Sequence, residues 1–128
     1  MKRFATILTL GALAILVGAC SGASAGEPAA SGPAVDASVV VSARDIKFEQ
    51  AELAAPANVA FALRFDNHDS APHNVSIYTD SSAGTAAFKG EIFGGDGSRT
   101  YQVPALAAGS YYFRCDVHPD MHGTIVAK

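Results

Sequence analysis

Three side chains with metal-binding donors lie close together near the C-terminus, in the segment 115–121. Cys115 offers a thiolate, His118 an imidazole and Met121 a thioether. Such soft and borderline donors suit copper better than magnesium or calcium, which prefer hard oxygen donors. A second imidazole would complete the set, and His73 is the best candidate. The residues therefore predict one mononuclear copper ion per chain, held by these four side chains; zinc remains an alternative for a Cys-His site.

The strand expected before Cys115 determines where its thiol points. Side chains alternate between the two faces of a strand, so Tyr111, Phe113 and Cys115 share one face. If Phe113 packs inward, Cys115 also points inward, at the end of the domain. His73 stands where a loop passes into the expected strand 74–78, and loops distant in sequence cluster at the ends of a β-sandwich. We therefore expect His73 to face the Cys115 loop.

Short runs with an apolar repeat of two residues dominate the chain after residue 38. Turn residues such as Gly, Asp, Asn and Ser separate the runs, which is typical of a β-sandwich or barrel. The segment Thr85–Lys89 is expected to be one helical turn or a loop. The sequence thus predicts an all-β domain. The expected strands contain Val39–Val41, Ile46–Glu49, Asn58–Phe65, Val75–Tyr78, Arg99–Val103, Ser110–Arg114 and Thr124–Val126.

The N-terminal segment has the pattern of a secretory signal peptide. A basic start, Met1–Arg3, precedes the apolar run Phe4–Val17, and the small residues Gly18–Ala19 follow. The apolar run is short for a membrane-spanning helix, although an uncleaved anchor helix is the alternative. We therefore expect residues 1–19 to be a signal peptide and the protein to act outside the cytoplasm.

The end of this segment, Leu16–Cys20, resembles the lipobox of bacterial lipoproteins, in which the cysteine is acylated and becomes the mature N-terminus. Cys20 is therefore the predicted lipidation site and membrane anchor. A disulfide between Cys20 and Cys115 is the alternative. Residues 20–37, rich in Ser, Gly, Ala and Pro, are expected to form a flexible linker, and residues 38–128 the folded domain.

The charge balance argues against nucleic acid as a partner. The chain carries a formal net charge of −3, and removal of Lys2 and Arg3 with the signal peptide would give −5 (−3 minus 2). No cluster of Lys and Arg remains that could follow a phosphate backbone.

The other two histidines and the acidic residues receive minor roles. His68 is expected to be a solvated loop residue, and His122 an exposed neighbour of Met121 or, alternatively, an axial ligand. The acidic residues are scattered and are expected to be solvated surface groups: Asp66, Asp69, Asp80, Glu91 and Asp96.

Two motifs together resemble the cupredoxins, the small blue-copper proteins. They are His73-Asn74 and Cys115-x-x-His118-x-x-Met121-x-Gly123, and the short ligand loop is most similar to that of the amicyanin branch. The resemblance extends over the domain from about residue 38. It implies a Greek-key β-sandwich with the predicted residues as copper ligands.

The resemblance also assigns roles around the ligands. His118 would present its ring edge at the surface, among Ala71, Pro72 and Pro119, where electrons enter or leave. Asn74 would tie the two ligand loops together. The chain departs from many cupredoxins at Asp116, where Ser or Thr is common, and at Val117, where Pro is common. The Asp116 carboxylate either accepts the tie from Asn74 or points to solvent.

The implied function is that of a monomeric one-electron carrier that exchanges electrons with redox partner proteins in the cell envelope and is not an enzyme. Copper enzymes of this family need further copper ions, usually bound through His-x-His pairs, and the sequence contains none. A Ser hydrolase would need a Gly-x-Ser-x-Gly motif at a turn between a strand and a helix, whereas the match in this sequence, Gly22–Gly26, falls in the expected linker. The alternative that the residues leave open is a copper-binding or delivery protein of the envelope without an electron-transfer role.

Overall fold

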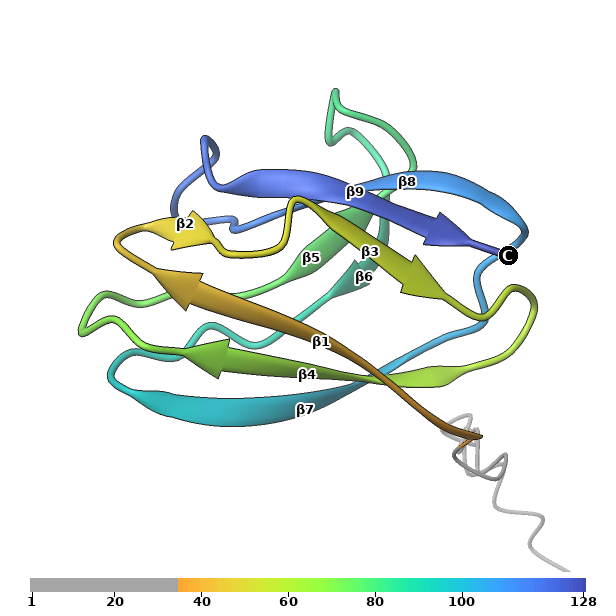
Figure 1. The fold of residues 1–128 in the computed structure, drawn as a ribbon. Helices are drawn as coiled ribbons and strands as arrows, with labels where there is room; N and C mark the ends of the chain where they lie inside the picture. Colours follow the sequence, from red (N-terminus) through yellow and green to blue (C-terminus); the bar gives the residue numbers. More distant parts are fainter. Residues whose placement is uncertain (1–34) are drawn as a thin grey trace, which may run out of the picture. The chain divides into compact units, whose positions relative to one another are not determined.

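The computed structural model describes residues 35–128, and within this range every regular element is a β-strand (Figure 1). The strands are β1 (Val35–Arg44), β2 (Lys47–Phe48), β3 (Glu52–Ala55), β4 (Phe61–Asn67), β5 (Ser76–Tyr78), β6 (Ala86–Lys89), β7 (Gly97–Val103), β8 (Gly109–Arg114) and β9 (His122–Ala127).

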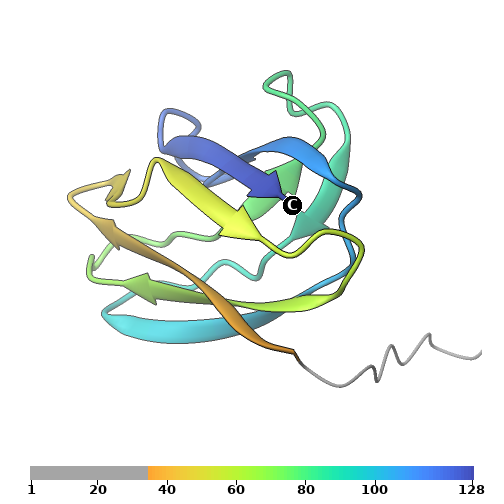
Figure 2. The same cartoon turned by 45° about the vertical axis from the view of Figure 1, so that its right-hand side comes forward.

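The strands form two sheets that lie one above the other in both views (Figures 1 and 2). The four-stranded sheet has the order β2-β1-β4-β7, and the five-stranded sheet has the order β3-β9-β8-β5-β6. β1 pairs with β4 and β3 pairs with β9 in parallel, while the other pairs are antiparallel. The predicted all-β Greek-key sandwich is confirmed.

The core lies between the sheets and follows from the two-residue repeat. In β4 the residues Phe61, Leu63 and Phe65 are buried, and from the opposite sheet Phe113 and others face them. Burial of each such side chain contributes about 1.5–3 kcal/mol. The ring of Phe48 joins the sheets, because its centroid lies 6.0 Å from that of Phe65 and 5.1 Å from that of Phe113. Phe65 and Phe113 thus lie near the ends of the strands that lead into the loops beginning at residues 68 and 115.

The predicted strand Asn58–Phe65 begins only at Phe61, as β4, and leaves Val59 exposed. Two further strands were not predicted. Residues 86–89 form β6 and neither a helical turn nor a loop, because they pair with β5, where Ile77 lies opposite Phe88. β3 was not predicted, since its alanines have low strand preference. Its partner β9 supplies the parallel ladder in which Leu53 lies opposite Ile125. The expected domain start near Ser38 falls inside β1.

The predictions for the N-terminus largely lie outside the described residues. This applies to the signal peptide 1–19, to Cys20 and to residues 20–34 of the linker. Cys115 is a buried free thiol. Residues 35–128 contain no helix with the length and apolar character to cross a membrane.

Candidate metal centre

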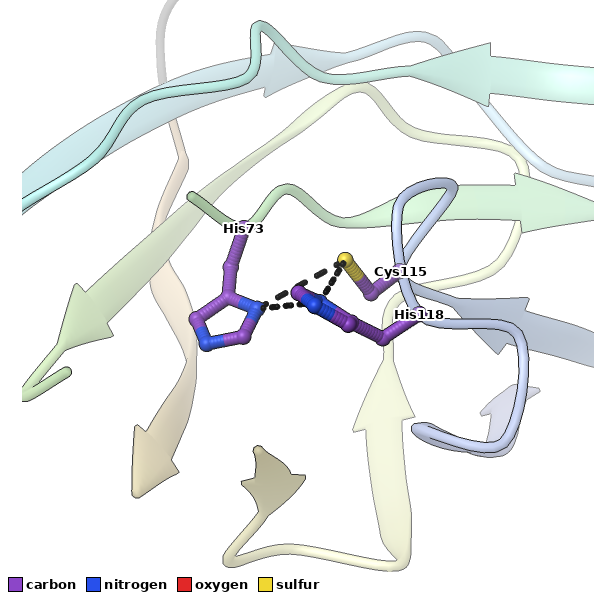
Figure 3. Close-up of side chains that lie close together, drawn as sticks. All are labelled: His73, Cys115 and His118. Carbon is purple, nitrogen blue, oxygen red and sulfur yellow. Dashed lines mark hydrogen bonds between the residues drawn. The ribbon is translucent and has the colours of Figure 1, made fainter. Parts of the chain in front are cut away.

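Three of the predicted ligands point toward one another at one end of the sandwich (Figure 3). His73 comes from the loop between β4 and β5, and Cys115 and His118 come from the loop between β8 and β9. The Cys115 Sγ atom lies 3.7 Å from His73 Nδ1 and 3.8 Å from His118 Nδ1. The two Nδ1 atoms are 3.1 Å apart. Residues 42 positions apart in the sequence thus meet as expected.

The fourth predicted ligand, Met121, closes the same loop. The Met121 backbone N–H donates to the His118 carbonyl, and the Cys115 N–H donates to the Met121 carbonyl, both at 2.9 Å. The Met121 side chain is buried. These bonds fix the loop 115–121 around the thiol. We call the four residues His73, Cys115, His118 and Met121 the metal centre.

The loop before His73 is held by a buried asparagine, Asn67. Its side-chain oxygen accepts the Asp69 N–H at 2.9 Å, and its amide group donates to the Ala71 carbonyl at 3.1 Å. At the other end of the loop, His73 exchanges two backbone hydrogen bonds of 3.0 Å with Phe93. These bonds fix the backbone of the loop up to His73, whose side chain is fully buried.

The spacing of the donors fits a bound metal ion. An ion with bonds of about 2.0–2.1 Å to nitrogen and about 2.3 Å to sulfur, in tetrahedral geometry, separates its donors by roughly 3.3–3.6 Å. The observed separations of 3.1–3.8 Å bracket this range. Two imidazoles, a thiol and a thioether together favour a soft or borderline ion such as copper. His73 and Cys115 have no exposed surface, whereas His118 is partly exposed.

Asn74 links the two ligand loops, as the resemblance implied. Its side-chain oxygen accepts the Asp116 backbone N–H at 2.8 Å, and its amide donates to the Asp116 carboxylate at 3.1 Å and to the Gly90 carbonyl at 2.9 Å. The tie holds the residue after Cys115 against the residue after His73. The Asp116 carboxylate therefore accepts a hydrogen bond from Asn74, which was the first of the two predicted alternatives, and does not simply point to solvent.

The Asp116 carboxylate also accepts hydrogen bonds from two hydroxyl groups of β5. Ser76 donates to it at 2.7 Å and Tyr78 donates to its other oxygen. Burial raises the pKa of Asp116, but the hydrogen bonds from Tyr78, Ser76 and Asn74 together outweigh burial and hold the pKa below its usual value. An ionised carboxylate therefore lies beside the cysteine of the metal centre.

Two of the acidic residues predicted to be solvated are not. The side chains of Asp66 and Asp69 are only 13% and 14% exposed. Asp69 accepts hydrogen bonds from two backbone N–H groups and contacts His73 Nε2 at 2.9 Å. The pKa of Asp69 is lowered, mainly by the hydrogen bond from the Ile46 N–H. Burial acts in the opposite direction but does not cancel this effect. The prediction that both carboxylates are solvated was wrong, because their hydrogen-bond donors include groups distant in the sequence, such as the Ile46 N–H for Asp69 and the Ser98 hydroxyl for Asp66.

The remaining histidines lie apart from the clustered donors. His68 pairs at the surface with the exposed Asp96, with 3.4 Å between Nδ1 and the carboxylate oxygen. His122 begins β9 and is exposed, with its ring 5.3 Å from that of Tyr112. His122 is not among the donors that converge with Cys115.

Sequence reasoning missed Asp69, Asn67, Ser76 and Tyr78. A signal existed for the last two, since Asn74, Ser76 and Tyr78 alternate along one strand and must share a face. No comparable local signal marks Asp69, because its donors come from the turn between β1 and β2.

The chain is similar to proteins of one family. Residues 9–127 match the model of the cupredoxin-like domain. Amicyanin of Paracoccus denitrificans is 30% identical over 101 residues, which cover 79% of this chain and 73% of that protein. The solved structure of amicyanin from Paracoccus versutus has a TM-score of 0.55 and 28% identity, and covers 75% of this chain and 86% of its own. Auracyanin A of Chloroflexus aurantiacus, a blue copper protein, shares the fold with a TM-score of 0.62 at 18% identity, over 71% of this chain and 98% of its own. The chain belongs to the cupredoxin family.

Proposed function

We propose that the protein is a one-electron carrier with a single type 1 copper ion at the metal centre. The observation that carries the proposal is the meeting of Cys115 Sγ with two imidazole Nδ1 atoms at 3.1–3.8 Å. Copper in such a site takes up and returns one electron. The family supports the proposal, since one relative of the same fold is described as a blue copper protein.

The residues around the metal centre limit rearrangement. Backbone hydrogen bonds close the loop 115–121, and Asn74 ties it to the other ligand loop. Donors that keep their positions in both oxidation states lower the reorganisation that electron transfer requires. Complete burial of His73 and Cys115 keeps a substrate from these donors, which favours a carrier over an enzyme.

His118 is the proposed entry point for electrons. It is the partly exposed histidine of the metal centre, and the neighbouring Val117, Pro72 and Pro119 are exposed and apolar. An apolar rim allows a partner to approach closely without the cost of desolvating charges. We call Pro72, Val117 and Pro119 the apolar rim.

We further propose that the protein acts in the cell envelope as a monomer. The signal-like segment 1–19 and the lipobox-like cysteine Cys20 support export and attachment to the membrane by a lipid. The linker 20–37 would let the domain reach its redox partner proteins while attached. A Cys20→Ala variant is then expected in the soluble fraction of the cells, and retention in the membrane fraction would favour an uncleaved anchor.

Repeated redox cycling distinguishes a carrier from a copper-delivery protein. The copper-loaded protein is reduced with ascorbate and reoxidised with ferricyanide over many cycles, in the presence of a strong Cu(I) chelator. A carrier keeps its copper and gives a reversible one-electron wave in voltammetry. Transfer of the copper to the chelator on first reduction would contradict the proposal. A His122→Ala variant is the control, because His122 lies outside the metal centre and its loss is expected to leave the wave unchanged.

A further inference from the structure

The turn between β1 and β2 has an unusual backbone. Asp45 and Ile46 both have positive φ, 53° and 56°. Two-residue hairpin turns of this type favour Asn-Gly, and a β-branched residue such as Ile46 is rare at positive φ. Such a conformation persists only where surrounding contacts impose it. The structure must therefore contain a group that holds this turn.

That group is the carboxylate of Asp69. One of its oxygens accepts the Asp45 N–H at 2.8 Å, and the other accepts the Ile46 N–H at 3.0 Å. Successive N–H groups in such a conformation form a concave site for an anion. The second oxygen also lies 2.9 Å from Nε2 of His73. One carboxylate thus joins the turn, at the surface, to a fully buried member of the metal centre.

The donors around Asp69 determine which nitrogen of His73 carries the proton. An ionised carboxylate only accepts hydrogen bonds, and here it already accepts two from the backbone. Nε2 of His73 must then carry a proton, and in the neutral imidazole this leaves the lone pair on Nδ1. Nδ1 is the atom that faces Cys115 Sγ and His118 Nδ1.

We propose that Asp69 is a positioning residue for the metal centre: it holds His73 in the Nε2–H form, with Nδ1 directed at the metal, and anchors that ring to the strained turn of Asp45 and Ile46. The inference rests on the proposed metal centre, but not on its electron-transfer role. Groups that orient a ligand histidine typically change metal affinity by roughly 10–100-fold when they are lost.

The direct test is the protonation of His73 in the metal-free protein, measured by the ¹⁵N chemical shifts of its imidazole nitrogens. The wild-type protein is expected to carry the proton on Nε2. A proton on Nδ1 would overturn the proposal without any variant, and this measurement is independent of whether the protein carries electrons.

Variants test the consequence for metal binding, measured as Cu(I) affinity in competition with a chelator. Asp69→Ala removes the acceptor and is expected to mix the two forms of His73 and to lower the affinity roughly 10–100-fold. Asp69→Asn keeps one oxygen that can accept from Nε2, so it is expected to bind more tightly than Asp69→Ala. If Asp69→Ala does not fold, the wild-type ¹⁵N shifts and the Cu(I) affinity of Asp69→Asn still test whether Asp69 positions His73.

Two matched controls distinguish the loss of the Asp69 carboxylate from a general loss of charge and from a change in the conformation of the turn. Asp96→Asn removes one charge from an 82% exposed side chain in the same region, next to His68. Ile46→Gly relieves the positive φ but keeps the backbone N–H groups that bond to Asp69. Both controls are expected to retain the wild-type affinity within about twofold. Wild-type affinity in Asp69→Ala, or an equal loss in the Asp96→Asn control, would contradict a positioning role.

Discussion

Asp116 directly follows the cysteine of the metal centre, and its carboxylate accepts hydrogen bonds from three side-chain donors. The donors are the side-chain amide of Asn74 and the hydroxyl groups of Ser76 and Tyr78, and the Asn74 oxygen in turn accepts the Asp116 backbone N–H. The contacts keep a negative charge fixed beside Cys115. A fixed negative charge stabilises the more positive oxidation state of a nearby metal ion. Asp116 is therefore expected to lower the reduction potential.

Asp116→Asn tests this effect, because it removes the charge and keeps the size of the side chain. Unit charges about 8–16 Å apart at an effective dielectric constant of about 20 interact by about 1–2 kcal/mol. The midpoint potential measured by voltammetry is expected to rise by an equivalent amount. Asp80→Asn, a change at an exposed residue, is the control and is expected to have little effect. An unchanged or lowered potential in Asp116→Asn would show that the charge does not act on the metal.

At the residue scale the sequence predicted which side chains meet but not what orients them. Cys115, His118 and Met121 lie within one loop, so their spacing alone indicates a site. His73 required the expectation that sandwich loops cluster at one end. Asp69 could not be found, because its role depends on how the turn between β1 and β2 packs against the His73 loop.

At the element scale, Gly123 allows β9 to pack closely against Ala51 and the ring of Phe113. A Cβ atom at this position would lie 2.5 Å from the Ala51 carbonyl and 2.6 Å from the Phe113 ring. Gly123→Ala is therefore expected to lower the free energy of unfolding by about 1–3 kcal/mol. Denaturant unfolding of the metal-free protein measures the effect.

Gly84→Ala is the matched control for this change. Its Cβ atom would make only an ordinary contact of 3.4 Å with Ser82 at an exposed site. The control is expected to change the unfolding free energy by no more than about 0.5 kcal/mol. Equal effects of the two substitutions would mean that close packing at Gly123 is not the cause.

Asp66, at the end of β4, contributes a pH dependence to stability. The hydrogen bond from Ser98 is the main cause that lowers the pKa of Asp66, and Arg64 lowers it further, against the opposing effect of burial. Because the folded-state pKa lies below the unfolded value, the contribution of Asp66 is present above the unfolded pKa. It is lost as the pH falls through the folded-state pKa.

Asp66→Asn is therefore expected to reduce stability at neutral pH and to make unfolding less dependent on pH in the acid range. Unfolding free energies of the wild type and the variant, measured between about pH 6 and pH 2, are expected to converge at low pH. Parallel curves across that range would mean that Asp66 has the same pKa in the folded and unfolded states.

The strands were predicted best where apolar residues alternate strongly. The alternation of Phe61, Leu63 and Phe65 gave β4, and that of Val75–Tyr78 gave β5. β3 and β6 consist largely of Ala and polar residues, and each is defined by its neighbour in the sheet. Pairing across the sheet is long-range information that a local pattern does not contain.

At the scale of the whole molecule, the proposed function needs only one of the two ends of the sandwich. The loop that carries Val117 lies at the end with the metal centre, and the loop between β3 and β4, which carries Val59, lies at the opposite end (Figure 1). Both valines are 40% exposed. If the apolar rim is the place where partners dock, only the first of these valines matters for electron exchange.

Val117→Asp is expected to slow electron self-exchange at least about tenfold, equivalent to about 1.4 kcal/mol, because a charge on the apolar rim must be desolvated when two molecules meet. Val59→Asp introduces the same charge at the far end and is the control. Self-exchange is measured by NMR line broadening in mixtures of the oxidised and reduced protein. A similar rate in both variants, with an unchanged optical spectrum, would exclude docking at the apolar rim.

The central claim is that one copper ion is bound by the Cys115 thiolate between His73 and His118. The optical and electron paramagnetic resonance spectra of the copper(II)-loaded protein test it most directly. The wild-type protein is expected to show the intense visible absorption of a copper–thiolate bond, and Cys115→Ser is expected to lose it. A colourless copper(II) form of the wild-type protein, or undiminished colour in Cys115→Ser, would contradict the account.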